Sequence, residues 1–524
     1  MKFWQKYDGW IIFLLGVLIC TSFIGLYPIY ILDEARNAEA AREMLETGNF
    51  IVPFFNGQIR TDKPPLHYYF MIFGYKLFGV NAFGARFFSG VFGALTIFTT
   101  YWHLKEHQNR TLALIVAMVL LSALFFVQEF HLAVPDPYLI FFITLSLFSF
   151  YSYYRTKQRS WLLVFYGAIA LGVLTKGPIA LVLPGLIVPI FLIFRNEFNI
   201  GTILGLRPFL GILLILLIAG PWYVLVHQHT NGEWTRGFFI DHNLSRFGSE
   251  KEGHGGLFIL TPLYVILGLL PFSVFIVQGF VAAWKARKEN DFILFSFVVS
   301  AITIIFFSIS STKLPNYPMP SYSFVGILIG FYIYKMFLLG KKAKSMTVSL
   351  IFLLVIGIVL PIGGWIGLTI EKQLTVQRHV SLFLLFAPAS AILGFYFYHT
   401  DRLKTAFMSI ACGWILLAFS LFGIIYPVLT SQSPVSMVMN TVPTDAQFVA
   451  FKRFDSAFPI NLERTLPVFD NIQELQRHIQ AHPETYIITN TREQKDIEAL
   501  EGVFHLILRQ KALFENHETR VYTK

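Results

Sequence analysis

Charged residues are scarce in this chain. Asp, Glu, Lys and Arg together make up 14% of its 524 residues, whereas soluble globular domains carry roughly 25%. The two cysteines, Cys20 and Cys412, both lie in apolar runs, which argues against a disulfide-stapled secreted module. The sequence also lacks a glycine-rich nucleotide-binding loop and a basic stripe with interleaved aromatics for nucleic acid. These absences exclude a soluble enzyme and argue against a nucleic-acid-binding protein.

Hydrophobic residues, by contrast, make up 55% of the chain and include 56 Phe. Thirteen apolar runs come near the ~20 residues that a helix needs to cross a bilayer. We therefore predict an all-α polytopic membrane protein in which residues 1–430 form a domain of about thirteen transmembrane helices. The predicted spans are 10–29, 83–103, 111–130, 137–154, 161–175, 177–194, 203–226, 257–284, 292–310, 317–337, 346–369, 380–398 and 405–428.

Hydropathy falls abruptly near Ser431. Residues 431–524 mix charges with short β-like stretches and one helix-like segment, Asn471–Gln480, which predicts a small soluble α/β domain. The β-like stretches are Gln447–Phe451, Tyr486–Thr489 and Phe504–Leu508.

The distribution of Lys and Arg predicts the orientation of the chain. If the N-terminus is cytoplasmic, eighteen Lys and Arg fall on that side, against twelve on the other, eight of which lie in its two long loops. This bias follows the positive-inside rule. No small-residue cleavage site follows the first apolar run, so we read it as an uncleaved span. With an odd number of spans, the C-terminal domain is expected outside the cytoplasm.

The first long loop, residues 30–82, holds the first candidate site residues. Asp33–Thr47 has the composition of a helix that ends at Gly48. Asp33 and Glu34 at its start either favour the helix dipole alone or place a catalytic carboxylate at the membrane–water boundary. Farther along, two prolines fix the backbone directly after Lys63. These prolines either form a simple turn or hold the charge of Lys63 in one place.

Further polar residues fall in later loops on the same side of the membrane. Asp136, Lys176 and Lys313 each interrupt apolar sequence, and His242 and Arg246 share one long loop. Fixed cations at the bilayer edge suit a phosphate-bearing lipid headgroup, and carboxylates beside them suit activation of a nucleophile. A lone loop histidine is usually solvated, and the ligand spacing of a metal site is not evident around His242.

Four segments carry a resemblance to a known family. They are Asp33-Glu34-Ala35-Arg36-Asn37-Ala38-Glu39, Asp62-Lys63-Pro64-Pro65-Leu66, Thr175-Lys176-Gly177-Pro178 and Lys313-Leu314-Pro315-Asn316-Tyr317. In this order they resemble motifs of the GT-C class of polyprenyl-phosphate-dependent membrane glycosyltransferases. That class includes the bacterial lipid A aminoarabinose transferase and the protein O-mannosyltransferases.

The resemblance implies inverting transfer of a sugar from a lipid-phosphate donor. Asp33 would be the catalytic carboxylate, with Glu34 beside it and Asp136 in the same cavity. The donor's phosphate and headgroup would be held by Lys63, Lys176, Arg246, Lys313, Tyr317 and Arg36. Asn37 replaces the usual aromatic residue of the first motif, and the spacing from His242 to Arg246 differs by one residue from that expected of a lipid A-modifying enzyme.

Several alternatives stay open at this stage. The acceptor is lipid A, another envelope glycolipid or a protein, and a divalent metal at His242 is an optional cofactor. A transporter or flippase is the rival from another class, although such proteins usually place ionisable groups near the bilayer midplane. The expected location is the bacterial inner membrane, with the active site and the C-terminal domain extracytoplasmic and with membrane lipid as surroundings.

Overall fold

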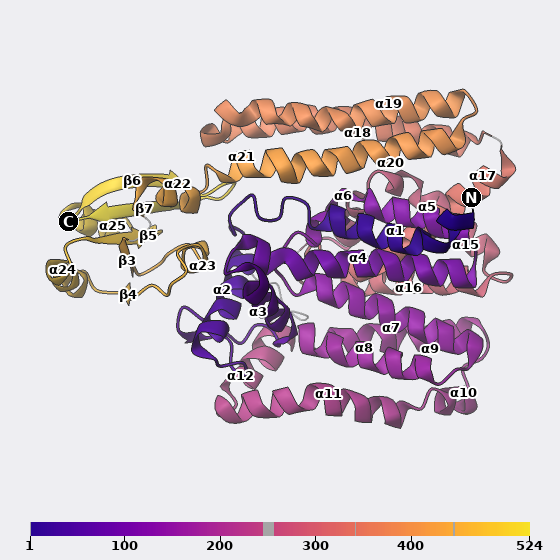
Figure 1. Cartoon of the computed structure of the whole chain (residues 1–524), viewed down its shortest axis with the longest axis horizontal. Coiled ribbons are helices and arrows are strands. Elements are labelled where there is room, and N and C mark those ends of the chain that lie inside the picture. The colour runs from indigo at the N-terminus through magenta and orange to yellow at the C-terminus, as the bar shows by residue number, and fades with distance from the viewer. Residues whose placement is uncertain (1, 245–255, 341, 444–445) are drawn as a thin grey trace.

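The computed structural model describes all residues except 1, 245–255, 341 and 444–445. A bundle of long helices forms most of the molecule, and a small sheet with its own short helices extends from one end (Figure 1). This confirms the predicted fold class, an all-α polytopic membrane protein with a small C-terminal α/β part.

Eight helical segments in the described part of the chain are long and apolar enough to cross a membrane, and a pair bent by 119° supplies a possible ninth. The eight are α4 (Ala82–His107), α7 (Asp136–Thr156), α10–α11 (Ile200–His229), α16 (Asp291–Ile309), η3–α17 (Met319–Leu339), α18 (Lys344–Ile370), η5–α19 (Val376–His399) and α20–α21 (Leu403–Thr430). The bent pair is α14 (Leu260–Gly268) with η2–α15 (Phe272–Ala286).

Four further apolar helices are shorter than 18 residues, so the count of thirteen spans stays a prediction. They are the apolar part of α1 (Lys2–Cys20), α5 (Arg110–Leu121), α8 (Ser160–Lys176) and α9 (Ile179–Phe194).

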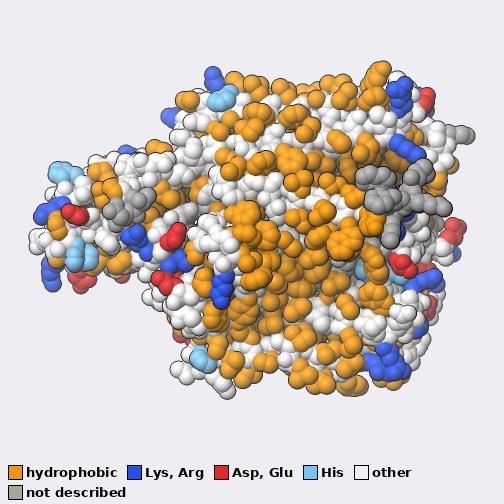
Figure 2. All heavy atoms as spheres, viewed as in Figure 1, with side chains coloured by type: hydrophobic (Ala, Val, Ile, Leu, Met, Phe, Trp, Pro, Cys, Tyr) orange, Lys and Arg blue, Asp and Glu red, His pale blue; other side chains and the backbone are white. Residues whose placement is uncertain are grey.

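The outer surface of the bundle is apolar. Figure 2 shows hydrophobic side chains covering the middle of the visible face, with the charged side chains gathered toward the two ends. Leu216 and Leu217 of α11, for example, are 61% and 62% exposed. Exposure of apolar side chains on this scale is unfavourable in water and favourable in hydrocarbon. In hydrocarbon the backbone N–H and C=O groups must also form their hydrogen bonds within the chain, as they do in helices.

The first long loop forms compact structure at the end of the bundle that faces the sheet (Figure 1). It contains α2 (Leu32–Thr47), a hairpin of β1 (Phe54–Phe55) and β2 (Gln58–Ile59), and α3 (Leu66–Phe78). The predicted helix is confirmed and ends at Gly48, which adopts a φ of +69° that glycine accepts without strain. Later elements at this end are α6 (Leu124–Glu129), α12 (Glu233–Arg236) and the π-helix η1 (Gly237–Leu244).

The C-terminal sheet has five strands in the order β4-β3-β5-β7-β6. The pairs β3–β4 and β3–β5 are parallel, whereas β5–β7 and β6–β7 are antiparallel. The strands are β3 (Gln447–Phe451), β4 (Val468–Phe469), β5 (Thr485–Thr489), β6 (His505–Lys511) and β7 (Glu518–Thr523). The accompanying helices are α22 (Pro434–Thr441), α23 (Ala457–Asn461), α24 (Ile472–Ala481) and α25 (Gln494–Glu501).

One hydrophobic core joins the first loop to this sheet. Met44 of α2 and Met71 of α3 are buried in the same cluster as Phe448 of β3, Phe458 of α23 and Val521 of β7. The apolar side of α2, formed by Ala35, Ala38, Ala41 and Met44, is therefore buried against protein. The first loop and the sheet are held together by this packing as well as by the chain.

Candidate active site

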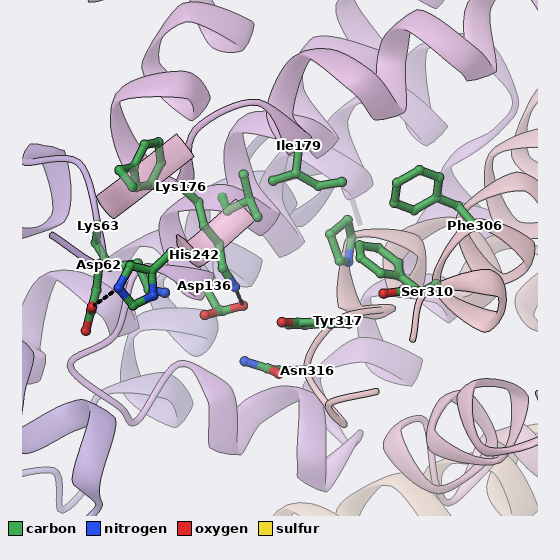
Figure 3. A pocket seen from close by; sticks show the side chains of 14 residues that line it. Asp62, Lys63, Asp136, Lys176, Ile179, His242, Phe306, Ser310, Asn316 and Tyr317 are labelled. Carbon is green, nitrogen blue, oxygen red and sulfur yellow. Dashed lines mark hydrogen bonds and ion pairs between the residues drawn. The ribbon is translucent and has the colours of Figure 1, made fainter. Parts of the chain in front are cut away.

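A cavity of about 140 Å³ lies where the first loop meets the ends of several helices. Its polar lining comes from five separate segments of sequence (Figure 3). The lining residues are Asp62, Lys63, Asp136, Leu139, Lys176, Ile179, Phe238, His242, Phe306, Phe307, Ser310, Asn316, Tyr317 and Pro320.

An ion pair between Asp136 and Lys176 occupies the centre of the view in Figure 3. Lys176 Nζ donates to Asp136 Oδ1 at 2.5 Å, and the side chains are 17% and 9% exposed. Asp136 lies in the first turn of α7 and Lys176 in the last turn of α8, where the two helix dipoles favour these charges. Lys176 Nζ also lies 5.5 Å from the centre of the Tyr317 ring. The pair is therefore a fixed, mostly dry charge pair facing an open space.

A second polar contact, between His242 and Asp62, lies on another side of the cavity. His242 Nε2 lies 2.8 Å from Asp62 Oδ1, and Arg60 lies 3.1 Å from Asp62 Oδ2. Burial opposes ionisation of Asp62, but the hydrogen bond with His242 and the charges of Arg60 and Lys63 outweigh it and hold the pKa of Asp62 well below its ordinary value. Asp62 is therefore ionised at neutral pH.

Close packing places η1, which carries His242, over the cavity. Gly177 adopts a φ of +84°, and a Cβ there would lie 2.5 Å from the Phe238 ring of η1. Trp234 supports η1 from α12, stacking on Phe238 with 4.8 Å between ring centres. Its indole Nε1–H donates to the carbonyl oxygen of Arg60 at 2.9 Å. Only glycine at 177 leaves room for this arrangement.

The structure brings five of the predicted site residues to one place: Lys63, Asp136, Lys176, His242 and Tyr317 all line the cavity. Asp33 is outside this lining set. It is exposed in the first turn of α2 and lies close enough to raise the pKa of Arg60, the partner of Asp62. The catalytic role of Asp33 stays a prediction.

Glu34 is held in a buried ion pair, and the predicted catalytic role of Glu34 stays a prediction. Its side chain is 1% exposed, and both carboxylate oxygens accept hydrogen bonds from Arg86, at 2.6 and 2.9 Å. The Ala133 N–H donates to the same carboxylate at 2.9 Å. These three hydrogen bonds and the burial of the carboxylate give Glu34 a structural role at the start of α2.

The predicted phosphate-binding roles of Lys313 and Arg36 also stay predictions, and both side chains make other contacts in the structure. Lys313 Nζ donates to the carbonyl oxygens of Ser308 and Ser310, at 3.1 and 2.5 Å. It thus caps the C-terminal end of α16, where helices favour cations. Arg36 points to a different cleft, beside Ser456 of the C-terminal part. Arg246 lies outside the described residues.

Sequence reasoning missed three polar groups at this site. Asp62 directly precedes Lys63, and this position beside a predicted site residue could have indicated that Asp62 belongs to the site. Asn316 lines the cavity, and the buried Glu129 of α6 lies close enough to Lys176 to interact with it electrostatically. Glu129 stands inside an apolar run, and a buried ionisable group at such a place marks a functional site by default.

Within the described part of the chain, no three His, Cys, Asp or Glu side chains are grouped so that they could hold a metal ion. His242 and Asp62 provide two donors and are bonded to each other, whereas zinc usually takes three or four protein ligands. His242 therefore has one potential co-ligand among the described residues, Asp62, and a divalent metal at His242 stays a prediction.

The comparisons with known proteins concern both sequence and fold. Residues 10–235 match the family model described as dolichyl-phosphate-mannose-protein mannosyltransferase. Two uncharacterized proteins of Aquifex aeolicus are 33% and 31% identical over 65% and 62% of this chain, and the matches cover 66% and 73% of their own lengths. An undecaprenyl phosphate-alpha-4-amino-4-deoxy-L-arabinose arabinosyl transferase of Erwinia tasmaniensis is 29% identical over 68% of this chain and 65% of its own. The match with these relatives thus spans about two thirds of their length.

The crystal structure of ArnT from Cupriavidus metallidurans bound to undecaprenyl phosphate has a similar fold. The TM-score is 0.78, with 98% of both chains covered and 18% sequence identity. Together with the sequence relatives, this similarity shows that the chain belongs to the GT-C class of polyprenyl-phosphate-dependent membrane glycosyltransferases.

Proposed function

We propose that this protein transfers a sugar from an undecaprenyl-phosphate-linked donor to an envelope glycolipid such as lipid A, with inversion at the anomeric carbon. The observation that carries the proposal is the Asp136–Lys176 ion pair, held with a second lysine, Lys63, in a cavity that has both polar and apolar walls. Lysines fixed in this way suit a phosphate at the head of a lipid chain.

In the proposed reaction, an oxygen of the acceptor attacks the anomeric carbon of the donor sugar. The new bond to that oxygen forms as the bond between the sugar and the phosphate oxygen breaks, so polyprenyl phosphate leaves. Lys176 and Lys63 stabilise the charge that develops on the leaving phosphate. We assign Asp33 to take the proton of the acceptor oxygen and Asp136 to orient Lys176. Arg246 is proposed as a further cation for the donor's phosphate.

The relatives support the donor class more than the acceptor. Undecaprenyl phosphate is part of the printed name of the Erwinia protein and is bound by the Cupriavidus one. The matching family model is described by its protein acceptor, so transfer to protein is the second candidate function. Analysis of both acceptor classes in one experiment separates the two.

The test is mass spectrometry of envelope glycolipids and glycoproteins from cells that carry the wild-type gene, no gene, or a variant. Asp136→Asn and Lys176→Met are expected to reduce transfer by about 100-fold or more, in line with the loss of one electrostatic contact to a developing charge. Lys105→Met is the matched control, because Lys105 pairs with Asp8 far from the cavity. Wild-type product levels in both cavity variants would refute the proposal. Parallel assays with and without EDTA test the divalent-metal prediction.

We further propose that the cavity and the C-terminal sheet lie on the extracytoplasmic side of the inner membrane. The bias of Lys and Arg toward the other loops supports this orientation. In a Cys412→Ser background, a membrane-impermeant thiol reagent is expected to label Arg509→Cys in intact spheroplasts and to leave Lys288→Cys unlabelled. The reverse pattern would refute the orientation.

A further inference from the structure

A second cleft, of about 440 Å³, lies between α2 and the C-terminal sheet. Arg36 of α2 lines one side, and Arg453 and Arg492, which follow strands β3 and β5, line the other. Figure 1 shows α2 and α23 next to each other at this junction. Nothing in the reaction described above uses these three arginines.

The three arginines lack acidic partners among the described residues. Arg36 is held in place by neutral groups: its Nε donates to Ser456 Oγ at 3.2 Å, and its guanidinium lies 5.8 Å from the centre of the Phe55 ring. Within the described ranges, no ion pair is formed by Arg36, Arg453 or Arg492. Three guanidinium groups around one cleft repel one another, so an anion that they share would be favourable there.

The other charged groups of the cleft are already engaged. Lys452 is paired with Asp496 of α25, at 2.7 and 2.8 Å. Glu515 is paired with His517 at 3.1 Å. The carboxylate of Asp455 accepts the N–H of a residue in α23, and burial raises its pKa. Without a ligand, the charge balance of the cleft is therefore positive.

Two more features point to a ligand. His517 Nε2 is buried and has no hydrogen-bond partner among the described residues, and such an atom is costly to leave unsatisfied. Tyr30, Phe55 and Phe454 give the cleft apolar and aromatic walls, which suit the faces of sugar rings. Forked guanidinium groups bind the oxygens of phosphate in pairs.

We propose that this cleft binds the phosphorylated saccharide headgroup of a glycolipid. Resting on the proposed function, we further identify that glycolipid as the acceptor of sugar transfer. Helix α2 connects the two sites. Asp33 lies close enough to act electrostatically on Arg60, the partner of the cavity residue Asp62, and Arg36, one turn later, lines the cleft. A headgroup bound in the cleft would thus have its oxygens close to the carboxylate assigned as the base.

The test is direct binding to the full-length protein in nanodiscs, without donor. The probes are an acylated disaccharide with phosphate monoesters, the same lipid after phosphatase treatment, and phosphatidylglycerol. The variant is Arg453→Gln/Arg492→Gln, and the control is Arg477→Gln, an exposed arginine on α24. The double variant is expected to bind the phosphorylated lipid about 10- to 100-fold more weakly, as the loss of charge-assisted hydrogen bonds predicts.

Three outcomes would overturn the inference. Equal binding of the dephosphorylated lipid would show that phosphate is not recognised. An equal loss of affinity in the control would indicate general surface charge, and full competition by phosphatidylglycerol would assign the cleft to ordinary membrane lipid. If the lipids bind as expected but neither the wild-type protein nor any variant transfers sugar, the proposed function is wrong and the proposal of glycolipid binding in the cleft is supported.

Discussion

Arg86 of α4 is predicted to be the most costly single charge to remove from this protein. It is 1% exposed, as is its partner Glu34. Besides the two bonds to Glu34, its guanidinium donates to the carbonyl oxygens of Ile24, Tyr27 and Pro28 at 2.7 to 3.2 Å. Replacement by Met leaves a buried carboxylate without its cation and three carbonyls without a donor. Breaking a buried pair in this way costs about 3–5 kcal/mol.

The measurement is unfolding of purified Arg86→Met in mixed micelles, followed by fluorescence and compared with Arg155→Met. Arg155 is 54% exposed and lies 3.5 Å from its acidic partner, so its replacement is expected to cost less than about 1 kcal/mol. The double variant Glu34→Leu/Arg86→Met is expected to recover part of the loss, because no buried charge is then left unpaired.

Sugar transfer per folded molecule separates the structural role of this pair from a catalytic one. We expect Glu34→Gln to lose stability and to retain transfer in the molecules that fold. A Glu34→Gln protein as stable as the wild type but without activity would refute the structural assignment of Glu34.

Two further predictions concern other parts of the molecule. The pKa of Asp62 is held below its ordinary value near 3.8. The contacts of Asp62 with His242 therefore stabilise the first long loop fully above about pH 4, and this stabilisation is lost as the pH falls further. Hydrogen exchange of the first long loop should show this acid dependence in the wild type and not in Asp62→Asn. Gly74→Ala places a Cβ 2.1 Å from a carbonyl oxygen of α4 and is expected to lower the free energy of unfolding by at least about 2 kcal/mol. A Cβ at Gly167 would meet no atom within 4 Å, so Gly167→Ala should leave the melting temperature unchanged or higher.

Much of the fold follows from patterns that the sequence shows locally. Apolar runs predict the long helices, and the strand at Gln447–Phe451 has the same bounds in the structure as in the prediction. The sequence did not indicate β7, Glu518–Thr523, because its charged residues are untypical of a buried strand, and only the pairing with β5 and β6 makes it a central strand of the sheet. Pairing between distant strands is a tertiary effect that local propensity does not contain.

The site was predictable in part, for a similar reason. Lys176 and Asp136 stand out because each is a charge inside apolar sequence. Lys313 stands out in the same way, yet its ammonium group turns back to the end of its own helix. A sequence shows that a charge is present at a helix end, but the direction of the side chain depends on the carbonyls and partners that the fold supplies.

The hydrophobic core shared by α2, α3 and the C-terminal sheet limits how this protein can be rebuilt. A truncation before β3 would expose Met44 and Met71 to water, so the shortened chain would lose its first loop as well as its sheet. Chimeras with related enzymes are therefore expected to work when residues 30–82 and the C-terminal segment are exchanged together as one cassette, and to aggregate when either is exchanged alone.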